Sequence, residues 1–219
     1  MALYLITGAN RGIGLEMCRQ LDERGDEVIA ACRCSSPALD AIGVRVETGL
    51  DVAHDDSVNL LADRLADVEI DVLVNNAGIL QNVSFDDLDL ESVRRQFDVN
   101  ALGPLRVTRA LRDHLGHGSK VAILTSLMGS LTDNTSGGHY GYRMSKAAVS
   151  MAGVSLAHDL RPRGIALAIL HPGMVSTDMT GHQGVPVDQS VRGLLDRIDG
   201  LTLDNSGTFW HSDGRVLPW

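Results

Sequence analysis

The sequence has few of the residues that mark several common classes of protein. Its 219 residues include three cysteines and eight aromatic residues. There are 19 Lys and Arg residues and 28 Asp and Glu residues, which gives a net charge of −9. An acidic chain with no cluster of Lys or Arg suits a polyanion poorly, which argues against nucleic-acid binding. Cys18, Cys32 and Cys34 are odd in number and lack a secretory context, so they predict reduced thiols and a cytoplasmic protein.

Long apolar runs and metal-ligand spacings are also missing. The only apolar stretch near the N-terminus, residues 3–6, is too short for a signal peptide. No run approaches the roughly 20 apolar residues of a membrane span. Cys32 and Cys34 have no second Cys or His pair at zinc-ligand spacing, and the eight histidines are scattered. We therefore expect no membrane association and no metal site.

Short apolar segments alternate along the chain with longer segments of helical periodicity. The predicted strands cover residues 2–7, 27–32, 44–48, 71–75, 120–125, 165–170 and 208–211. The predicted helices cover residues 11–24, 55–66, about 90–115, 142–161 and 188–198. The strands lack polar–apolar alternation, as expected where helices cover both faces of a parallel sheet. The pattern predicts an α/β fold, a single Rossmann-type domain (1–219) with a doubly wound parallel sheet of about seven strands.

A glycine-rich turn, Thr-Gly-Ala-Asn-Arg-Gly-Ile-Gly at residues 7–14, joins the first predicted strand to the first helix. Glycines there let the chain bend tightly and let a pyrophosphate approach the free amides of the helix N-terminus. A glycine turn without a ligand is the alternative, but the position within a βαβ unit favours a dinucleotide. The candidate cofactor-binding residues of this turn are Gly8, Asn10, Arg11, Gly12, Ile13 and Gly14.

The end of the second predicted strand indicates which dinucleotide is bound. Proteins that use NAD(H) usually place Asp or Glu there, against the ribose 2′-hydroxyl. This chain has Arg33 instead, and Arg11 in the turn adds a second cation. Two guanidinium groups suit a 2′-phosphate, so we expect NADP(H) rather than NAD(H), the alternative being that both arginines are merely solvated.

A tyrosine and a lysine four residues apart, Tyr142 and Lys146, share one face of a predicted helix. An ammonium group near a phenol stabilises the phenolate, which brings the tyrosine into the range of proton transfer. Tyr142 could donate a proton to a carbonyl oxygen as hydride arrives, and Ser126 could hydrogen-bond to the same oxygen. Ser126 lacks the Gly-x-Ser-x-Gly setting of a hydrolase nucleophile. A Tyr and a Lys four residues apart on a helix are more often exposed residues without a catalytic role. Here the pair follows a dinucleotide-binding turn and a serine at the end of a strand, and this order of motifs along the chain favours catalysis.

Several motifs in a fixed order resemble the short-chain dehydrogenase/reductase family, over nearly the whole chain. They are the Thr-Gly-x-x-x-Gly-x-Gly turn, Asn-Asn-Ala-Gly at residues 75–78 and Pro-Gly at residues 172–173. The closing segment, with Trp210, Asp213-Gly214 and Leu217-Pro218-Trp219, resembles the C-factor/sniffer-like branch, whose members are linked to carbonyl reduction or signalling.

The resemblance implies a catalytic set. Tyr142 would be the acid/base, Lys146 would bind the nicotinamide ribose and lower the pKa of Tyr142, Ser126 would orient the substrate, and Asn100 would hold a water for proton relay. The further cofactor-binding residues that it implies are Asp51, Val52, Asn76, Ala77, Gly78, Pro172, Gly173, Val175 and Thr177, together with Tyr142 and Lys146 themselves. Asn75 and Asn76 have a purely structural turn as their alternative. Residues 1–125 would mainly bind the cofactor, and residues 126–219 would face the substrate.

The resemblance thus implies an NADP-dependent carbonyl reductase or alcohol dehydrogenase acting on a small molecule. An NADP-binding signalling protein with little turnover is the alternative. Apolar faces on the fourth and fifth helices fit either core packing or a homodimer or homotetramer contact. Ser126 and Tyr142 are 16 residues apart, more than is usual in the family, so the polar loop 132–139 should border the substrate. Only residues 176–185 are available as a lid.

Overall fold

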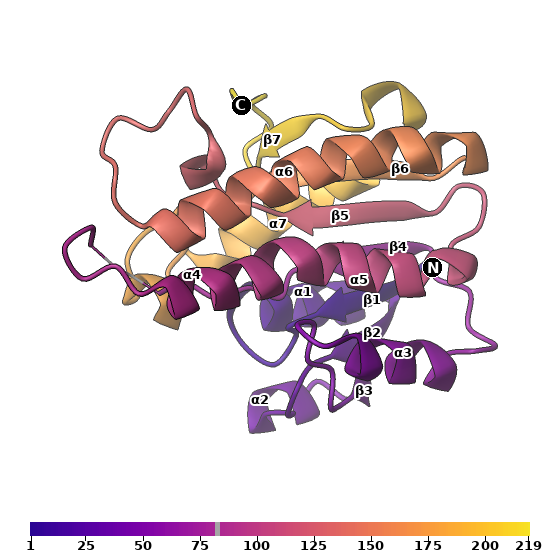
Figure 1. Cartoon of the computed structure of the whole chain (residues 1–219). Helices are drawn as coiled ribbons and strands as arrows, with labels where there is room; N and C mark the ends of the chain where they lie inside the picture. The colour runs from indigo at the N-terminus through magenta and orange to yellow at the C-terminus, as the bar shows by residue number, and fades with distance from the viewer. Residues whose placement is uncertain (82–83) are drawn as a thin grey trace.

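A parallel β-sheet forms the middle layer of the computed structural model, which describes residues 1–81 and 84–219 (Figure 1). Within these residues the strands are β1 (Leu3–Thr7), β2 (Glu27–Ala31), β3 (Arg45–Glu47), β4 (Val72–Asn75), β5 (Lys120–Leu124), β6 (Ala166–His171) and β7 (Phe209–His211). They lie in the order β3-β2-β1-β4-β5-β6-β7. From β1 the chain first adds β2 and β3 toward one edge of the sheet. It then crosses back to the other side of β1 and adds β4 to β7 toward the opposite edge. The predicted doubly wound sheet is therefore confirmed, with its topological switch between β1 and β4.

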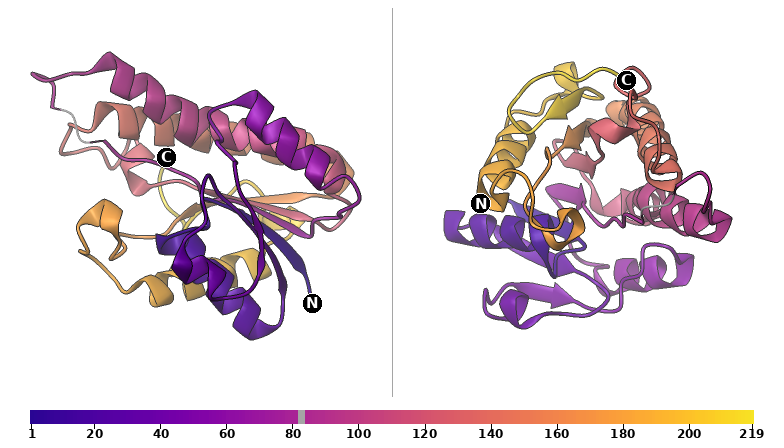
Figure 2. Two further views of the ribbon diagram at one scale, coloured as in Figure 1. Left: turned by 90° about the horizontal axis from the view of Figure 1, so that it is seen from below. Right: turned by 90° about the vertical axis from the view of Figure 1, so that its left-hand side faces the viewer.

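Helices cover both faces of this sheet (Figure 2). They are α1 (Gly12–Arg24), α2 (Pro37–Asp40), α3 (Asp55–Arg64), α4 (Leu90–Phe97), α5 (Gly103–Ala110), α6 (Tyr140–Leu160) and α7 (Val187–Asp199). Apolar side chains of α3, α5 and α6 form a cluster with one face of the sheet, and those of α1 and α7 form a cluster with the other.

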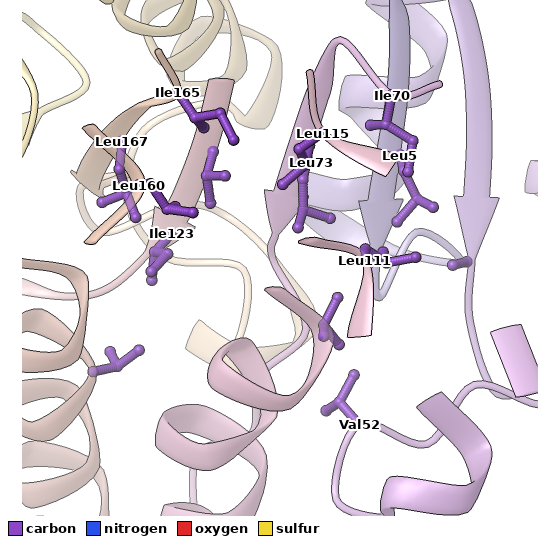
Figure 3. Close-up of a cluster of buried hydrophobic side chains, with 14 of the residues drawn as sticks. Leu5, Val52, Ile70, Leu73, Leu111, Leu115, Ile123, Leu160, Ile165 and Leu167 are labelled. Atoms are coloured by element: carbon purple, nitrogen blue, oxygen red, sulfur yellow. The ribbon is translucent and has the colours of Figure 1, made fainter. Parts of the chain in front are cut away.

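The inner strands are apolar because both of their faces are buried, whereas β3, at one edge of the sheet, is Arg-Val-Glu. Leu5 of β1 belongs to the first cluster, whereas its neighbours Tyr4 and Ile6 belong to the second. Figure 3 shows part of the first cluster, in which Leu5 and Leu73 from the sheet lie near Leu111. Alternate residues point to opposite sides, so a strand between two helical layers shows no polar face.

The helix predicted over residues 90–115 is interrupted. After α4 comes a π-helical turn, Asp98–Leu102, then α5, and finally a 3₁₀ turn, Arg112–His114. Pro104 has no N–H to donate to the carbonyl four residues back, so the α-helical ladder cannot continue unchanged through this point. The Gly103 N–H instead donates to the carbonyl of Asp98, five residues back. Asn100 lies inside this π turn.

Other differences are small and local. α6 begins at Tyr140, two residues before its predicted start, and the predicted loop after β6 contains a 3₁₀ turn, Asp178–Thr180. Periodicity does not predict α2 because it is a single turn. α2 forms because the Ser36 side chain accepts from the Leu39 N–H and Pro37 occupies the first helical position.

Candidate active site

The residues predicted to carry chemistry follow the carboxyl ends of neighbouring strands. The glycine turn follows β1, the Asn-Asn-Ala-Gly segment begins at the end of β4, Ser126 follows β5, and Pro172-Gly173 follows β6. These strands are adjacent and parallel, so all four segments meet at one edge of the sheet. The topological switch, where open α/β sheets bind their ligands, lies at the same edge.

The glycine turn is shaped by close backbone approach. Gly8 has a φ of 67°, in the left-handed region that favours glycine. A Cβ atom on Gly14 would lie 2.5 Å from the Gly8 carbonyl oxygen and 2.6 Å from Asn76 Nδ2. Arg11 precedes α1 without capping it, which leaves the first amides of the helix without a side-chain acceptor. The glycines therefore let the turn pack closely against the end of β4, and the first amides of α1 are available as donors for a pyrophosphate.

Thr7 and Asn76 join this turn to the end of β4. The Thr7 hydroxyl accepts from the N–H groups of Asn76 and Ala77, both at 3.1 Å. The Asn76 amide nitrogen donates to the carbonyls of Thr7 and Gly8 at 2.8 and 3.1 Å, so both of its protons are used. The neighbouring Asn75 donates to the Thr108 hydroxyl of α5. The side-chain nitrogens of Asn75 and Asn76 therefore act in the structural role that was the alternative for them. Thr7 belongs to the predicted turn, but its bonds to residues 76 and 77 were not predicted.

The two arginines predicted to bind a 2′-phosphate stand beside this turn. Arg33 is exposed just after β2, and its segment is joined to the turn by a bond from the Ser36 hydroxyl to the Asn10 carbonyl oxygen, 2.8 Å long. Arg11 lies 3.8 Å from Asp178, with both side chains about two-thirds exposed. A pair so exposed and so long is weak, so Arg11 remains able to exchange Asp178 for another anion.

Tyr142 and Lys146 point from α6 into the protein. Tyr142 is 9% exposed and Lys146 5%. Lys146 Nζ donates to the Leu124 carbonyl oxygen at 2.9 Å and lies 5.6 Å from the centre of the Tyr142 ring. The Ser126 oxygen accepts from the Met128 N–H, which leaves its own proton free to donate. A phenol, an ammonium and a hydroxyl are thus brought together at the end of β5.

Burial dominates the ionisation of this group. It lowers the pKa of Lys146 to about 8. It also raises the pKa of Tyr142, and the Ser126 hydroxyl opposes that rise. The resemblance predicted that Lys146 would lower the Tyr142 pKa, but in the protein alone the net shift is upward. Tyr142 therefore holds its proton at neutral pH, as a proton donor must.

α6 is fixed against the end of β5 by a second polar contact that the sequence did not reveal. The Thr125 hydroxyl donates to the Lys146 carbonyl oxygen at 3.1 Å and lies 2.9 Å from the Ser150 hydroxyl. All three groups are buried. This contact sets the register of α6 along β5, and with it the position of Lys146 relative to Ser126.

Asn100 uses its amide to hold neighbouring segments. Its Oδ1 accepts from the Ile79 N–H and its Nδ2 donates to the Ile79 carbonyl oxygen, both at 2.8 Å. The same nitrogen donates to the Ser145 hydroxyl at 3.0 Å, which in turn donates to the Tyr142 carbonyl oxygen at 2.8 Å. The Asn100 side chain thus bonds to protein groups on two segments, and the water that Asn100 is expected to hold for proton relay stays a prediction.

The segment after β6 lies against the glycine turn. The Pro172 carbonyl oxygen accepts from the hydroxyls of Ser190 and Ser212, at 2.7 and 3.1 Å. A Cβ atom on Gly12 would lie 3.5 Å from the Thr177 methyl group. Val175 pairs with Val185 in an isolated bridge. The two ends of the predicted lid, residues 176–185, are thus held together by this bridge.

His171 and His211 form an edge-to-face pair with ring centres 5.1 Å apart, and His171 Nδ1 is buried with no hydrogen-bond partner among the residues that the structure describes. Burial, with the positive charges of His211, Lys146 and Arg215, lowers the pKa of His171 to about 4. His171 therefore stays neutral beside Lys146. The sequence identified His171 only as the neighbour of Pro172, and it gave no role to His211.

The opposite edge of the sheet carries a hollow of about 440 Å³ lined by charged residues, but these satisfy one another. Arg24 pairs with Asp26 and Asp199, and Lys120 donates to the carbonyls of Ile198 and Asp199. Over residues 1–81 and 84–219, no three His, Cys, Asp or Glu side chains gather as metal ligands. No helix in that part of the chain has the length and hydropathy to cross a bilayer.

Comparison with known proteins gives consistent matches. A model of the family described as short chain dehydrogenase matches residues 2–185. The 1-hydroxy-2-glutathionyl-2-methyl-3-butene dehydrogenase of Rhodococcus sp. (strain AD45) is 45% identical over 226 residues, covering 100% of both chains. The C-signal of Myxococcus xanthus is 49% identical over 154 residues, which cover 68% of this chain and 93% of that protein.

A solved structure shares the whole fold. The NADPH-bound carbonyl reductase from chicken fatty liver superposes with a TM-score of 0.89 at 29% identity, covering 100% of this chain and 99% of that one. The similarity therefore includes the sheet, its helices and the edge at which the polar residues gather.

Proposed function

The chain belongs to the short-chain dehydrogenase/reductase family of oxidoreductases, and on that premise we propose that it transfers hydride between NADP(H) and a carbonyl or alcohol group of a small molecule. Tyr142 is the general acid/base in this proposal. The observation that carries it is the buried Tyr142 ring, with Lys146 Nζ 5.6 Å from its centre, at the edge of the sheet that holds the glycine turn.

Bound NADP(H) would supply or accept the hydride. In the reducing direction the Tyr142 hydroxyl donates its proton to the carbonyl oxygen as hydride reaches the carbonyl carbon. The C=O double bond becomes a C–O single bond, and one C–H bond and one O–H bond form. Ser126 donates its free proton to the same oxygen and orients it. The buried Lys146 ammonium stabilises the phenolate that remains, until solvent returns a proton.

Binding of NADP(H) rests on the shape and charge of the glycine turn. Gly14 packs against the Gly8 carbonyl and Asn76 with no room for a Cβ atom, which keeps the turn tight, and Arg11 does not cap α1, so its first backbone amides can donate to a pyrophosphate. Arg33 and Arg11 supply positive charge for a 2′-phosphate, and no carboxylate stands in place of Arg33. Asp51 and Val52, after β3 at the same edge, would meet the adenine, and Val175 with Thr177 would meet the nicotinamide. In this proposal residues 1–125 mainly hold the cofactor and residues 126–219 mainly face the substrate.

The Rhodococcus relative suggests one substrate class to test. Its name describes an alcohol that carries a glutathionyl group. We therefore include a primary alcohol that carries a glutathionyl group on the neighbouring carbon, with NADP⁺, in the assay, beside benzaldehyde, acetophenone and menadione with NADPH. Direction is read from the gain or loss of absorbance of the reduced nicotinamide.

The test is Tyr142→Phe, which removes the hydroxyl and keeps the ring. We expect turnover to fall at least a hundredfold, because general acid–base catalysis contributes about 10²–10⁴-fold. NADPH affinity, measured by quenching of protein fluorescence, should stay within about twofold because the phosphate-binding turn is untouched. Turnover equal to that of the wild type would remove Tyr142 from the mechanism.

The similarity to the C-signal of Myxococcus xanthus supports a second candidate, an NADP-binding signalling protein with little turnover. Tight NADPH binding with no turnover across the panel would favour it. The grouping of Ser126, Tyr142 and Lys146 favours the enzyme, since a sensor needs no proton donor. A homodimer or homotetramer stays a prediction, measurable by light scattering.

A further inference from the structure

Two side-chain amides four residues apart hold the chain that follows β4. Asn100 bonds to both backbone groups of Ile79, at 2.8 Å each. Gln96 does the same for Gln81: its Oε1 accepts from the Gln81 N–H at 3.0 Å, and its Nε2 donates to the Gln81 carbonyl oxygen at 3.2 Å. Alternate residues of one segment are thus held in the same way.

The two spacings match. Residues four apart on a helix are separated by about 6 Å along its axis, and residues two apart in an extended chain by about 6.6 Å. The side-chain amides of Gln96 and Asn100 are therefore spaced like alternate residues of a β-strand. Ile79 and Gln81 form backbone hydrogen bonds with these two amides, as they would with the edge of a neighbouring strand. We name this arrangement the amide clamp, formed by Gln96 and Asn100 on residues 79–81.

The amide clamp also touches the helix that carries Tyr142. Gln96 is fully buried, and a Cβ atom on Gly141 would lie 2.6 Å from its Nε2. The second Nε2 proton is directed to the Ser92 hydroxyl at 3.3 Å. All the hydrogen-bonding capacity of the Gln96 amide nitrogen is used, so the side chain has one orientation against the first turn of α6.

The clamped segment continues directly from the catalytic region. A Cβ atom on Gly78 would lie 3.3 Å from Asn100 Oδ1 and 3.7 Å from Lys146 Nζ. Residues 78–81 thus run from Lys146 along α4 to the point where Gln96 meets Gly141. A shift of this segment would move one wall of the site, and a shift of Gly141 would move Tyr142.

We propose that Gln96 is a positioning residue for the reaction, fixing residues 79–81 and the first turn of α6 so that the Tyr142 hydroxyl is held at the substrate oxygen. This inference rests on the proposed role of Tyr142. Gln96 bonds to Gln81 and Ser92 and to no group of the glycine turn or Asn76, so we expect its loss to affect proton transfer much more than the contacts of the cofactor phosphates. A purely structural Gln96 would affect stability and leave turnover per folded molecule unchanged.

The main variant is Gln96→Met, which keeps the length and volume of the side chain and removes both hydrogen-bonding groups. We expect kcat to fall about tenfold, since small displacements of catalytic groups cost one to two decades in rate. NADPH affinity should change less than twofold. Hydrogen exchange should accelerate at the Gln81 N–H and stay slow at the Ile79 N–H, which Asn100 still holds.

Gln20→Met is the matched control, because Gln20 also donates from its amide to a distant backbone carbonyl, that of Asp188, at 3.0 Å. It should lower the melting temperature and leave kcat unchanged. Gln96→Glu gives a second readout. Its carboxyl group resembles the amide only when protonated, so its kcat relative to wild type should rise as the pH falls from 8 to 6.

The outcomes separate the two proposals. An unchanged kcat for Gln96→Met, together with an inactive Tyr142→Phe, would overturn the role of Gln96 and leave the proposed function standing. Unchanged exchange at Gln81 would also overturn it, whatever the turnover. Full turnover by Tyr142→Phe would instead refute the proposed function, and with it the reason for positioning Tyr142.

Discussion

Lys146 carries an ammonium group into the protein interior, and this has a measurable effect on stability. Burial lowers its pKa from 10.5 to about 8. One unit of pKa corresponds to about 1.4 kcal/mol, so the charged side chain destabilises the fold by about 3 kcal/mol at neutral pH. Below pH 8 both states are protonated and the full penalty applies. Between pH 8 and 10.5 the unfolded chain binds more protons, so stability rises with pH, and above 10.5 the penalty disappears.

Lys146→Met removes the charge and keeps most of the volume. It also removes the 2.9 Å bond to the Leu124 carbonyl oxygen, which is worth about 1 kcal/mol. The variant should therefore be about 2 kcal/mol more stable than the wild type at pH 7 and about equal to it at pH 10. It should also be inactive, because no cation remains to stabilise the Tyr142 phenolate.

The measurement is urea unfolding of the cofactor-free protein, followed by circular dichroism at pH 7 and pH 10. Lys120→Met is the control, since Lys120 is the other lysine of the chain and its Nζ donates to two carbonyls at the end of α7. Burial also lowers the pKa of Lys120, so its charge carries a penalty too, but Met at this position removes two hydrogen bonds, and this loss should leave the variant no more stable than the wild type at pH 7. A Lys146→Met protein that is less stable than wild type at pH 7, or that differs equally at both pH values, would refute the reasoning.

Two further variants test the cofactor and the histidine pair. Arg33→Asp should weaken NADPH binding ten- to a hundredfold and NADH binding far less, because a charge-assisted contact is worth about 1.5–3 kcal/mol; equal losses for both cofactors in a titration would contradict the assignment. His171 has its pKa lowered from 6.5 to about 4, so protonation of the unfolded chain should remove about 3 kcal/mol of stability as the pH falls from 6.5 to 4. His171→Phe should lose less over that range in urea titrations, and parallel losses would rule out this origin.

The sheet and its glycine turn were predictable because their signals are local. Most strands are short apolar runs, and the longer helices repeat their apolar residues over several turns, so the order of elements follows from the sequence, although β3 (Arg-Val-Glu) is polar and the break between α4 and α5 is not predicted. Residues 7–14 combine a turn, a helix start and a strand end within eight positions. The spacing of Tyr142 and Lys146 likewise needs only one helix to place both side chains on one side.

The contacts that shape the site were not predictable because they join distant segments. Thr7 meets Asn76 across 69 residues, and Asn100 meets Ser145 across 45. Nothing near Gln96 indicates that its amide would bond to Gln81 or face Gly141. The upward shift of the Tyr142 pKa has the same origin, since the sequence shows a neighbouring lysine and not the depth at which both side chains are buried.

The departures from regular structure gather around the same few residues. The π turn places Asn100 between residue 79 and α6, and the buried ammonium of Lys146 has, within residues 1–81 and 84–219, one hydrogen bond, to the Leu124 carbonyl oxygen. Beside it, His171 remains neutral with an unpartnered nitrogen. Each of these features destabilises the protein without its ligands, and a bound cofactor or substrate is what can offset the penalty. The increase in melting temperature on binding NADPH should therefore be smaller for Lys146→Met than for the wild type, because that variant has already lost the buried charge.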